Sequence, residues 1–86
     1  MSQTEEYWTL RYHPEVTRYL YELREAGSEI RKAVKSLAKG IPTDAQKIQD
    51  APETWEWLDA RHWITFVVDR DRRWLDVTDV ESATVA

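Results

Sequence analysis

Apolar and polar residues alternate in four segments of this chain, and this pattern predicts four β-strands. Alternation sends successive side chains to opposite faces of a sheet, so that one face can be apolar throughout. Within residues 7–12, Trp8, Leu10 and Tyr12 share one face. The same pattern returns in the C-terminal half of the chain, over residues 54–59, 62–68 and 73–80.

A helical period replaces the alternation between residues 14 and 40. Pro14 suits the first turn of a helix, because the N–H that proline lacks has no partner there. Gly27 predicts the end of this helix in a left-handed conformation, and Ser28 predicts the N-cap of a second helix. The two apolar stripes consist of Val16, Tyr19, Leu20 and Leu23 in the first helix and Ile30, Ala33, Val34 and Leu37 in the second, which ends at Gly40.

Residues 41–53 lie between the two halves and show no clear period, so we expect them to form mostly loop. The predicted order is therefore β-α-α-β-β-β. We expect an α+β fold in which the two-helix hairpin packs on one face of a four-stranded, mainly antiparallel sheet, because so small a sheet has no other way to bury an apolar face. Residues 7–80 form the single predicted domain, between a disordered tail of residues 1–6 and a C-terminal tail of residues 81–86.

The composition narrows the class of protein. The chain has 86 residues, of which 42% are hydrophobic and 33% charged, as in a globular domain. It has no cysteine and only two histidines, which excludes disulfides and thiolate metal sites, so we expect no metal and no cofactor. No apolar run approaches the roughly 18 residues of a transmembrane helix. We expect a cytoplasmic protein without a membrane partner.

The net charge of −4 is unevenly distributed. Residues 14–39 carry six basic and four acidic residues, whereas residues 41–60 carry five acidic residues and one basic residue. An acidic total disfavours tight non-specific binding to nucleic acids, which requires several cations against phosphates. It leaves room for a local basic surface.

Several residues are candidates for phosphate chemistry. Cleavage next to a 2′-hydroxyl requires a base, an acid and cations that stabilise charge on the phosphate. Arg61, His62 and Arg73 are the candidate catalytic residues, although alternation places His62 at the rim of the core. His13 is more simply explained as the residue that begins the first helix. The candidate RNA- or phosphate-binding residues are Arg31, Lys35, Lys39, Arg70 and Arg72. The first three line one side of the second helix, and an ordinary solvent-exposed face opposite the apolar stripe also explains their spacing.

Tryptophan is unusually frequent, with five residues. By alternation Trp63 lies on the sheet face without helices, where it can anchor a partner protein, stack on a base or pack on a sheet neighbour. Trp57 and Trp74 join it as candidate partner-binding residues, whereas we expect Trp8 to pack under the helices. The aspartates around residues 69–79 lack the spacing of a calcium loop and are better explained by a polar hairpin.

The chain resembles the RelE/ParE superfamily of toxins from bacterial toxin–antitoxin systems. The resemblance covers residues 7–80 and rests on the element order and on three motifs: LRYHPEV at 10–16, IRKAVKSLAKGIP at 30–42 and HWITFVVD at 62–69. It implies a toxin that an antitoxin segment neutralises. RelE-branch members cut messenger RNA on the ribosome, and ParE-branch members inhibit DNA gyrase.

The resemblance also implies where an RNase of this kind has its cations. Such members carry an arginine at the position of Trp63, and basic or aromatic residues where this chain has Asp79-Val80-Glu81-Ser82. Three function classes therefore stay open: a ribosome-dependent messenger RNase, a gyrase inhibitor without catalysis, and an inert member that only binds a partner. For any antitoxin, the acidic segment 41–60 predicts a complementary lysine or arginine.

Overall fold

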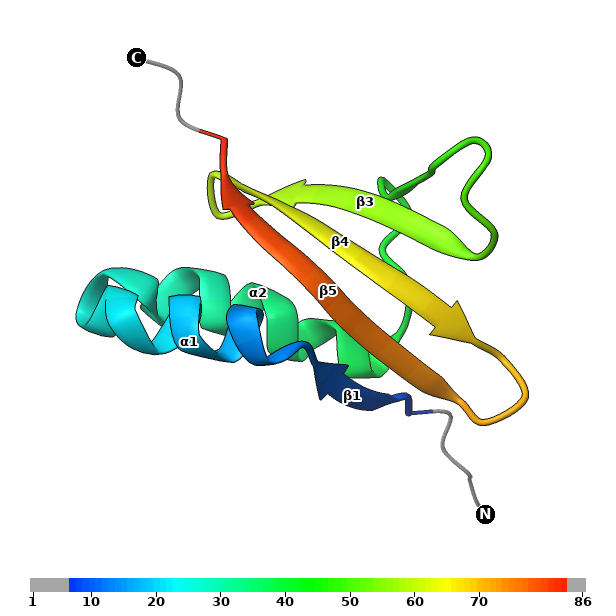
Figure 1. Cartoon of the computed structure of the whole chain (residues 1–86), viewed down its shortest axis with the longest axis horizontal. Coiled ribbons are helices and arrows are strands. Elements are labelled where there is room, and N and C mark those ends of the chain that lie inside the picture. The colour runs from blue at the N-terminus through cyan, green and yellow to red at the C-terminus, as the bar shows by residue number, and fades with distance from the viewer. Residues whose placement is uncertain (1–6, 84–86) are drawn as a thin grey trace.

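The computed structural model describes residues 7–83, which form a sheet with two helices on one face (Figure 1). The predicted tails at 1–6 and 84–86 lie outside these residues. The helices are α1 (Pro14–Leu23) and α2 (Ser28–Ser36), each followed by a short 3-10 turn, η1 (Arg24–Gly27) and η2 (Leu37–Lys39). The strands are β1 (Thr9–Tyr12), β2 (Gln46–Lys47), β3 (Thr54–Asp59), β4 (His62–Asp69) and β5 (Trp74–Ser82). The predicted α+β fold with its helical hairpin on one sheet face is confirmed.

The described residues form five strands, in the spatial order β1-β5-β4-β3-β2. Only the β1–β5 pair is parallel, and β3, β4 and β5 form the predicted antiparallel meander. The fifth strand corrects the predicted count of four. It is β2, a pair of residues inside the segment 41–53, whose backbone pairs with Trp55 and Glu56. Two polar residues show no alternation, so the pattern of side chains could not reveal a strand that backbone hydrogen bonds define.

A β-bulge in β5 explains why its buried residues do not alternate strictly. Phe66 pairs with Val77, but Thr65 pairs with Asp79, which leaves Thr78 as the extra residue. The Thr78 hydroxyl donates a hydrogen bond to the carbonyl of Thr65 at 3.3 Å. Val77 and Val80 are therefore both buried, although they are three residues apart.

The last strand also continues beyond the predicted domain boundary at residue 80. Glu81 pairs with Trp63 and Ser82 pairs with His62. Residues 81 and 82 thus belong to the sheet and not to a tail, because β4 still offers backbone partners at that end.

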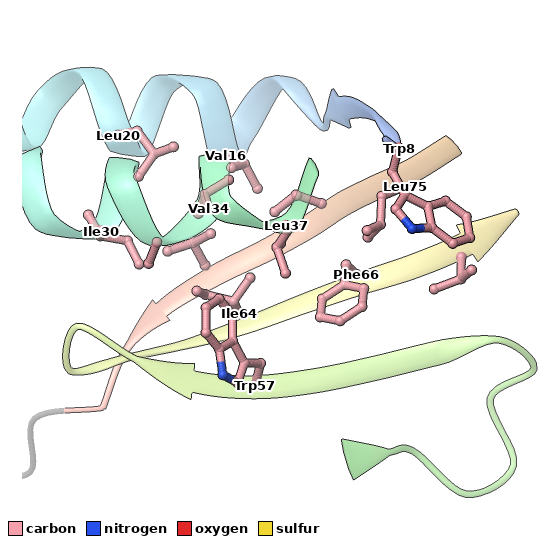
Figure 2. Close-up of a cluster of buried hydrophobic side chains, with 14 residues drawn as sticks. Trp8, Val16, Leu20, Ile30, Val34, Leu37, Trp57, Ile64, Phe66 and Leu75 are labelled. Carbon is pink, nitrogen blue, oxygen red and sulfur yellow. The ribbon is translucent and has the colours of Figure 1, made fainter. Parts of the chain in front are cut away.

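The core lies between the helices and the inner face of the sheet (Figure 2). Both predicted helix stripes face inward. Trp8 is buried in the same core cluster, beside Leu75 at the end of the sheet where β1 begins (Figure 2). The largest fully buried side chains are Ile30, Val34 and Leu37 from the helices and Ile64, Phe66, Leu75 and Val77 from the sheet. Within residues 7–83, no helix is long and apolar enough to cross a bilayer.

The connection between the helices differs from the prediction. α1 ends at Leu23, and the positive φ of 53° belongs to Arg24, whereas Gly27 has a φ of −93°. Ser28 is the first residue of α2 and not its N-cap, because α2 continues directly from η1 and the Ser28 N–H bonds to the Glu25 carbonyl.

Gly27 is needed here for space and not for a left-handed backbone. A Cβ on Gly27 would lie 2.8 Å from Nη1 of Arg31 and 2.8 Å from the Cβ of Leu23. The Arg31 guanidinium passes through this gap and donates to the carbonyls of Leu20 and Arg24. It thereby satisfies carbonyls at the C-terminal end of α1, which have no partner within that helix.

Candidate functional site

The face of the sheet that points away from the helices is the candidate site. Residues directly opposite each other in an antiparallel pair share one face. Trp57 and Ile64 are opposite each other and buried, so their neighbours Leu58 and Trp63 point outward. We call this outward side the open face.

Two rows of side chains cross the open face near the β3–β4 turn. One row runs Leu58–Trp63–Glu81, and the next runs Glu56–Thr65–Asp79. We define the apolar–acidic patch as the two apolar and three acidic members of these rows: Leu58, Trp63, Glu56, Asp79 and Glu81.

Leu58 and Trp63 form the apolar part of the patch. They are opposite each other in the register, and 47% of Leu58 and 40% of Trp63 remain exposed. The prediction that Trp63 lies on the face without helices is confirmed. An exposed tryptophan next to an exposed leucine is the kind of surface that a partner covers, because both lose contact with water on binding.

The carboxylates give the patch its charge. Glu56 lies two residues before Leu58 on β3, and Asp79 and Glu81 lie on β5. Among the described residues, neither of these two rows contains a lysine or an arginine. A phosphate would meet a negative potential here, whereas a lysine or arginine of a partner would be attracted.

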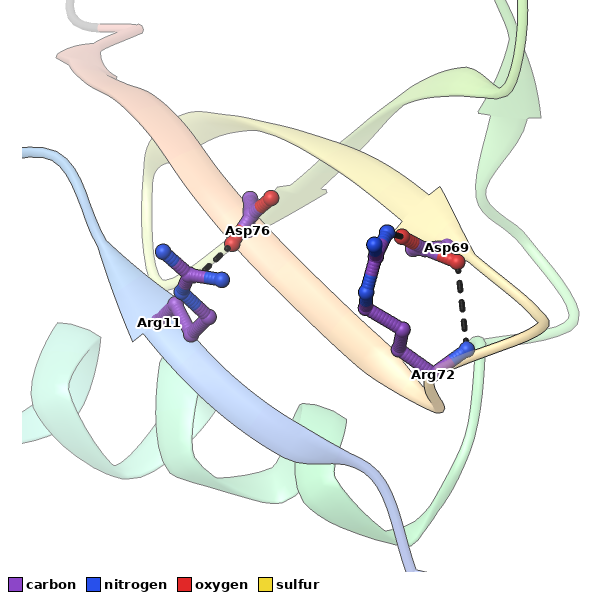
Figure 3. Close-up of polar contacts among 4 residues, drawn as sticks. All are labelled: Arg11, Asp69, Arg72 and Asp76. Atoms are coloured by element: carbon purple, nitrogen blue, oxygen red, sulfur yellow. Dashed lines mark hydrogen bonds and ion pairs between the residues drawn. The ribbon is translucent and has the colours of Figure 1, made fainter.

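The opposite end of the open face holds two arginines on the ring of Trp74. The guanidinium carbon of Arg11 lies 4.1 Å from the ring centroid, and that of Arg72 lies 5.0 Å from it. Arg11 also pairs with Asp76 at 3.5 Å, and Arg72 pairs with Asp69 at 3.1 Å (Figure 3). Trp74, a candidate partner-binding residue, is thus engaged by cations of its own chain.

Asp69 is held in its charged form by the turn that follows β4. The backbone N–H of Arg72 donates to its Oδ1 at 3.2 Å, and the Arg72 guanidinium donates to Oδ2. These hydrogen bonds, the backbone one first, lower the pKa of Asp69 below its ordinary value. The Asp69–Arg72 pair therefore closes the β4–β5 turn.

His62 has a partner on each ring nitrogen. Nδ1 lies 2.8 Å from the carbonyl of Ala60, and Nε2 lies 3.0 Å from the hydroxyl of Tyr19. A carbonyl only accepts, so Nδ1 donates to Ala60, and in the tautomer with one proton Nε2 then accepts from the Tyr19 hydroxyl. The nitrogen that a general base would use is occupied in this arrangement.

The structure does not bring the three candidate catalytic residues together. Arg61 and His62 lie at the β3–β4 turn, whereas Arg73 precedes β5 at the other end of β4 and stacks on Trp8 at 4.3 Å. The eight residues of β4 separate the two ends by roughly 20 Å.

The candidate phosphate-binding residues are divided between the two sides of the molecule. Arg70 and Arg72 lie in the β4–β5 turn and pair with Glu53 at 3.7 Å and with Asp69 at 3.1 Å. Arg31 supports the end of α1, and Lys35 and Lys39 are exposed on the helical side. Within residues 7–83, no three histidine or acidic side chains lie close enough to hold a metal ion.

The prediction that Trp57 on β3 binds a partner is wrong, because its side chain is buried. Only 8% of it is exposed, and its indole Nε1 donates to Oδ1 of Asp44 at 3.0 Å. Trp57 shares the inward face of β3 with Trp55, opposite Ile64. Trp57 lies among the buried core side chains (Figure 2), and its hydrogen bond to Asp44 holds the loop before β2 against the core.

The sequence pattern did not reveal the side chains that lie next to Trp63 on the open face. Leu58 and the two β5 carboxylates join Trp63 only through the register across the β3–β4 turn and through the bulge at Thr78. A two-residue turn at Ala60-Arg61 would have predicted the first pairing, but neither residue is typical of such a turn.

No protein-family model matches the sequence, and no curated protein matches it significantly. Among solved structures, the chain is similar to the crystal structure of the isolated E. coli RelE toxin, with a TM-score of 0.61 and 19% sequence identity. The match covers 92% of this chain and 87% of that chain. The chain therefore has the RelE-like fold that its motifs predict.

Proposed function

We propose that this chain is the toxin of a bacterial toxin–antitoxin pair, and that it acts by binding a protein and not by cutting RNA. The RelE-like fold supports the first part. The observation that carries the second part is the apolar–acidic patch, because Trp63 occupies the position at which the resemblance implies the arginine of an RNase.

The chemistry of RNA cleavage is poorly supported by the open face. A phosphate that gains charge needs free cations beside it. Around Trp63 the polar neighbours across the sheet are the carboxylates of Glu81 and Asp79. The nearest histidine, His62, already uses both ring nitrogens.

The same patch suits the surface of a protein. Trp63 and Leu58 provide apolar area next to the β3–β4 turn, and the three carboxylates that flank this pair favour a basic partner. Proteins of both kinds, a cellular target and an antitoxin, can compete for one patch. Inhibition of gyrase and neutralisation by an antitoxin segment with lysine or arginine are the specific forms of this proposal.

The test is growth of a bacterial host after induced expression of the chain. We expect growth arrest without cleavage of messenger RNA in a translating extract, and relief of the arrest by Trp63→Ala. Tyr7→Ala is the matched control, since it removes another exposed aromatic side chain outside the patch. Normal growth with soluble, folded protein would refute the toxin assignment, and ribosome-dependent cleavage of messenger RNA would refute protein binding as the mode of action.

A further inference from the structure

The exposed apolar side chains of this molecule gather on two different sides. Among the described residues, five large hydrophobic side chains are exposed. Leu58 and Trp63 lie in the apolar–acidic patch on the open face. Tyr12 and Tyr21 lie on the helical side, and Tyr7 precedes β1. Two separate apolar surfaces on so small a domain indicate contacts with other molecules on both sides.

The two tyrosines of the helical side border a cleft of about 610 Å³ between α1, α2 and the end of β1. We call it the helical cleft. Leu20 of α1 and Val34 of α2 line its apolar floor, and both also belong to the core. The helices cover one face of the sheet, and the open face points away from them (Figure 1). The helical cleft and the apolar–acidic patch therefore lie on different sides of the molecule.

The two surfaces carry opposite charges. Arg24, Arg31 and Lys35 line the helical cleft, and no acidic side chain lines it within residues 7–83. The apolar–acidic patch has three carboxylates, and its two rows lack lysine and arginine in the part of the chain that the structure describes. Three cations on one side thus match three carboxylates on the other. A chain with two such surfaces is complementary to a second copy of itself.

The helical cleft is already formed in the single chain. Its inner cation, Arg31, is fixed because its guanidinium donates to the carbonyls of Leu20 and Arg24. The missing Cβ of Gly27 leaves space for this guanidinium. The patch is equally fixed, because backbone pairing within the sheet sets its rows. Association of two preformed surfaces avoids the cost of ordering either of them.

We propose that copies of this chain associate head to tail, with the apolar–acidic patch of one copy against the helical cleft of the next. Trp63 of one copy would pack on Tyr21 of the next, and Glu81 would meet Lys35. The two surfaces face different ways, so the contact does not close after two copies, and the assembly grows with concentration. A symmetric contact between two patches is disfavoured, because it would bring their carboxylates together.

Such an assembly hides the patch that the proposed function uses, in every copy except one at the end. Self-association and binding of a target protein would then compete for Trp63. The proposal goes beyond the proposed function, because it names a second copy of the chain as a partner and does not depend on toxicity.

The experiment is sedimentation velocity on the full chain at concentrations from roughly 1 μM to 1 mM, which covers weak contacts. We expect the weight-average mass to rise with concentration above that of one chain. Raising the salt to about 1 M should lower it again, because the charges are then screened. Tyr21→Ala should also weaken the assembly, although it changes no charge.

Two charge reversals locate the contact. Lys35→Glu alters only the cleft and Glu81→Lys alters only the patch, and both residues are exposed. Each variant alone should associate at least about fivefold more weakly than the unchanged chain. An equimolar mixture should form a complex of two chains and nothing larger, because the first variant keeps its patch and the second keeps its cleft.

Lys32→Glu is the matched control. Lys32 lies on the same helix as Lys35 and is also exposed, but it lines a groove with Asp59 and Ala60 outside the helical cleft. This variant has the same net charge as Lys35→Glu. It should assemble within about twofold of the unchanged chain.

Three outcomes would overturn the proposal. The first is the mass of a single chain at every concentration. The second is undiminished assembly of Lys35→Glu, which would mean that the cleft is not part of the contact. The third is a mixture of the two variants that stays as single chains. None of these results depends on growth arrest, so a toxin that stays monomeric would refute only the self-association.

Discussion

The hydroxyl of Tyr19 on α1 lies 3.0 Å from Nε2 of His62 on β4, and this bond joins the helical layer to the sheet. The two rings also meet edge to face, with centroids 5.8 Å apart. Tyr19→Phe removes only the hydroxyl and leaves Nε2 of His62 without this partner. We expect the free energy of unfolding to fall by about 1 kcal/mol.

Urea denaturation of the full chain measures this loss. Tyr21→Phe is the control, because Tyr21 is 79% exposed on the same helix, and it should leave the urea midpoint unchanged. Equal stability of the Tyr19→Phe variant and the unchanged chain would show that the bond contributes nothing in solution.

Gly27→Ala tests the role of space in the helical connection. The backbone of Gly27, with φ −93° and ψ 6°, suits alanine, and at such a site the change normally stabilises a protein by roughly 0.4–1 kcal/mol. Here the new Cβ meets Arg31 and Leu23 at 2.8 Å, so we expect destabilisation of about 1–3 kcal/mol. We expect the thermal midpoint of the Gly27→Ala variant to fall. A higher midpoint would contradict the close packing of Gly27 against Arg31 and Leu23.

In the β3–β4 turn we expect a substitution to glycine to stabilise the chain. Ala60 and Arg61 have φ values of 50° and 61°, the left-handed pair of a type I′ turn, which favours asparagine and glycine. Arg61→Gly removes the Cβ from a left-handed backbone and should raise the free energy of unfolding by about 0.5–1 kcal/mol.

Arg61→Ala is the matched control for the turn. It removes the same long side chain but keeps the Cβ, so it should bring no gain in the urea midpoint. If both variants stabilise the chain equally, the arginine side chain and not the backbone is the cause.

The particular surprises of the fold share a physical origin. Alternation correctly predicted both faces of β4, from the buried Ile64 and Phe66 to the exposed Trp63, because burial acts on side chains. The strand at Gln46–Lys47, the bulge at Thr78 and the left-handed turn at Ala60-Arg61 are backbone features. At these positions the sequence has neither a glycine nor an alternating pattern, so nothing in it predicts these backbone features.

The candidate site was predictable to a similar degree. Trp63 was correctly placed on the exposed face, but Trp57 was not. Trp57 is buried because its indole N–H donates to Asp44, and this acceptor lies 13 residues away in a loop, where the sequence pattern of β3 cannot reveal it. Arg31 looked like one of three equivalent cations on a helix. Its contacts with the carbonyls of Leu20 and Arg24 depend on the angle of the hairpin, which no spacing within α2 specifies.

Asp69 predicts how the stability depends on pH. Its pKa in the folded chain lies below the ordinary value of 3.8, mainly because of the backbone N–H of Arg72. A carboxylate with a lowered folded pKa contributes stability that is present above its unfolded pKa and is lost as the pH falls through the folded pKa. We therefore expect Asp69→Asn to narrow the difference between the urea midpoints at pH 7 and near pH 3. An unchanged difference would mean that Asp69 is not charged preferentially in the folded chain.

Trp63→Arg tests the chemistry of the open face directly, because it returns a cation to the position implied for an RNase. Glu81 lies directly opposite this position, and Asp79 lies on the same strand, so the new guanidinium would pair with carboxylates before it met a phosphate. We expect Trp63→Arg to lose growth arrest to the same extent as Trp63→Ala, since both remove the apolar anchor. Neither variant should cleave messenger RNA in a translating extract, as read by primer extension. Cleavage by Trp63→Arg alone would show that the rest of an RNase site is already present, and that a single tryptophan keeps it silent.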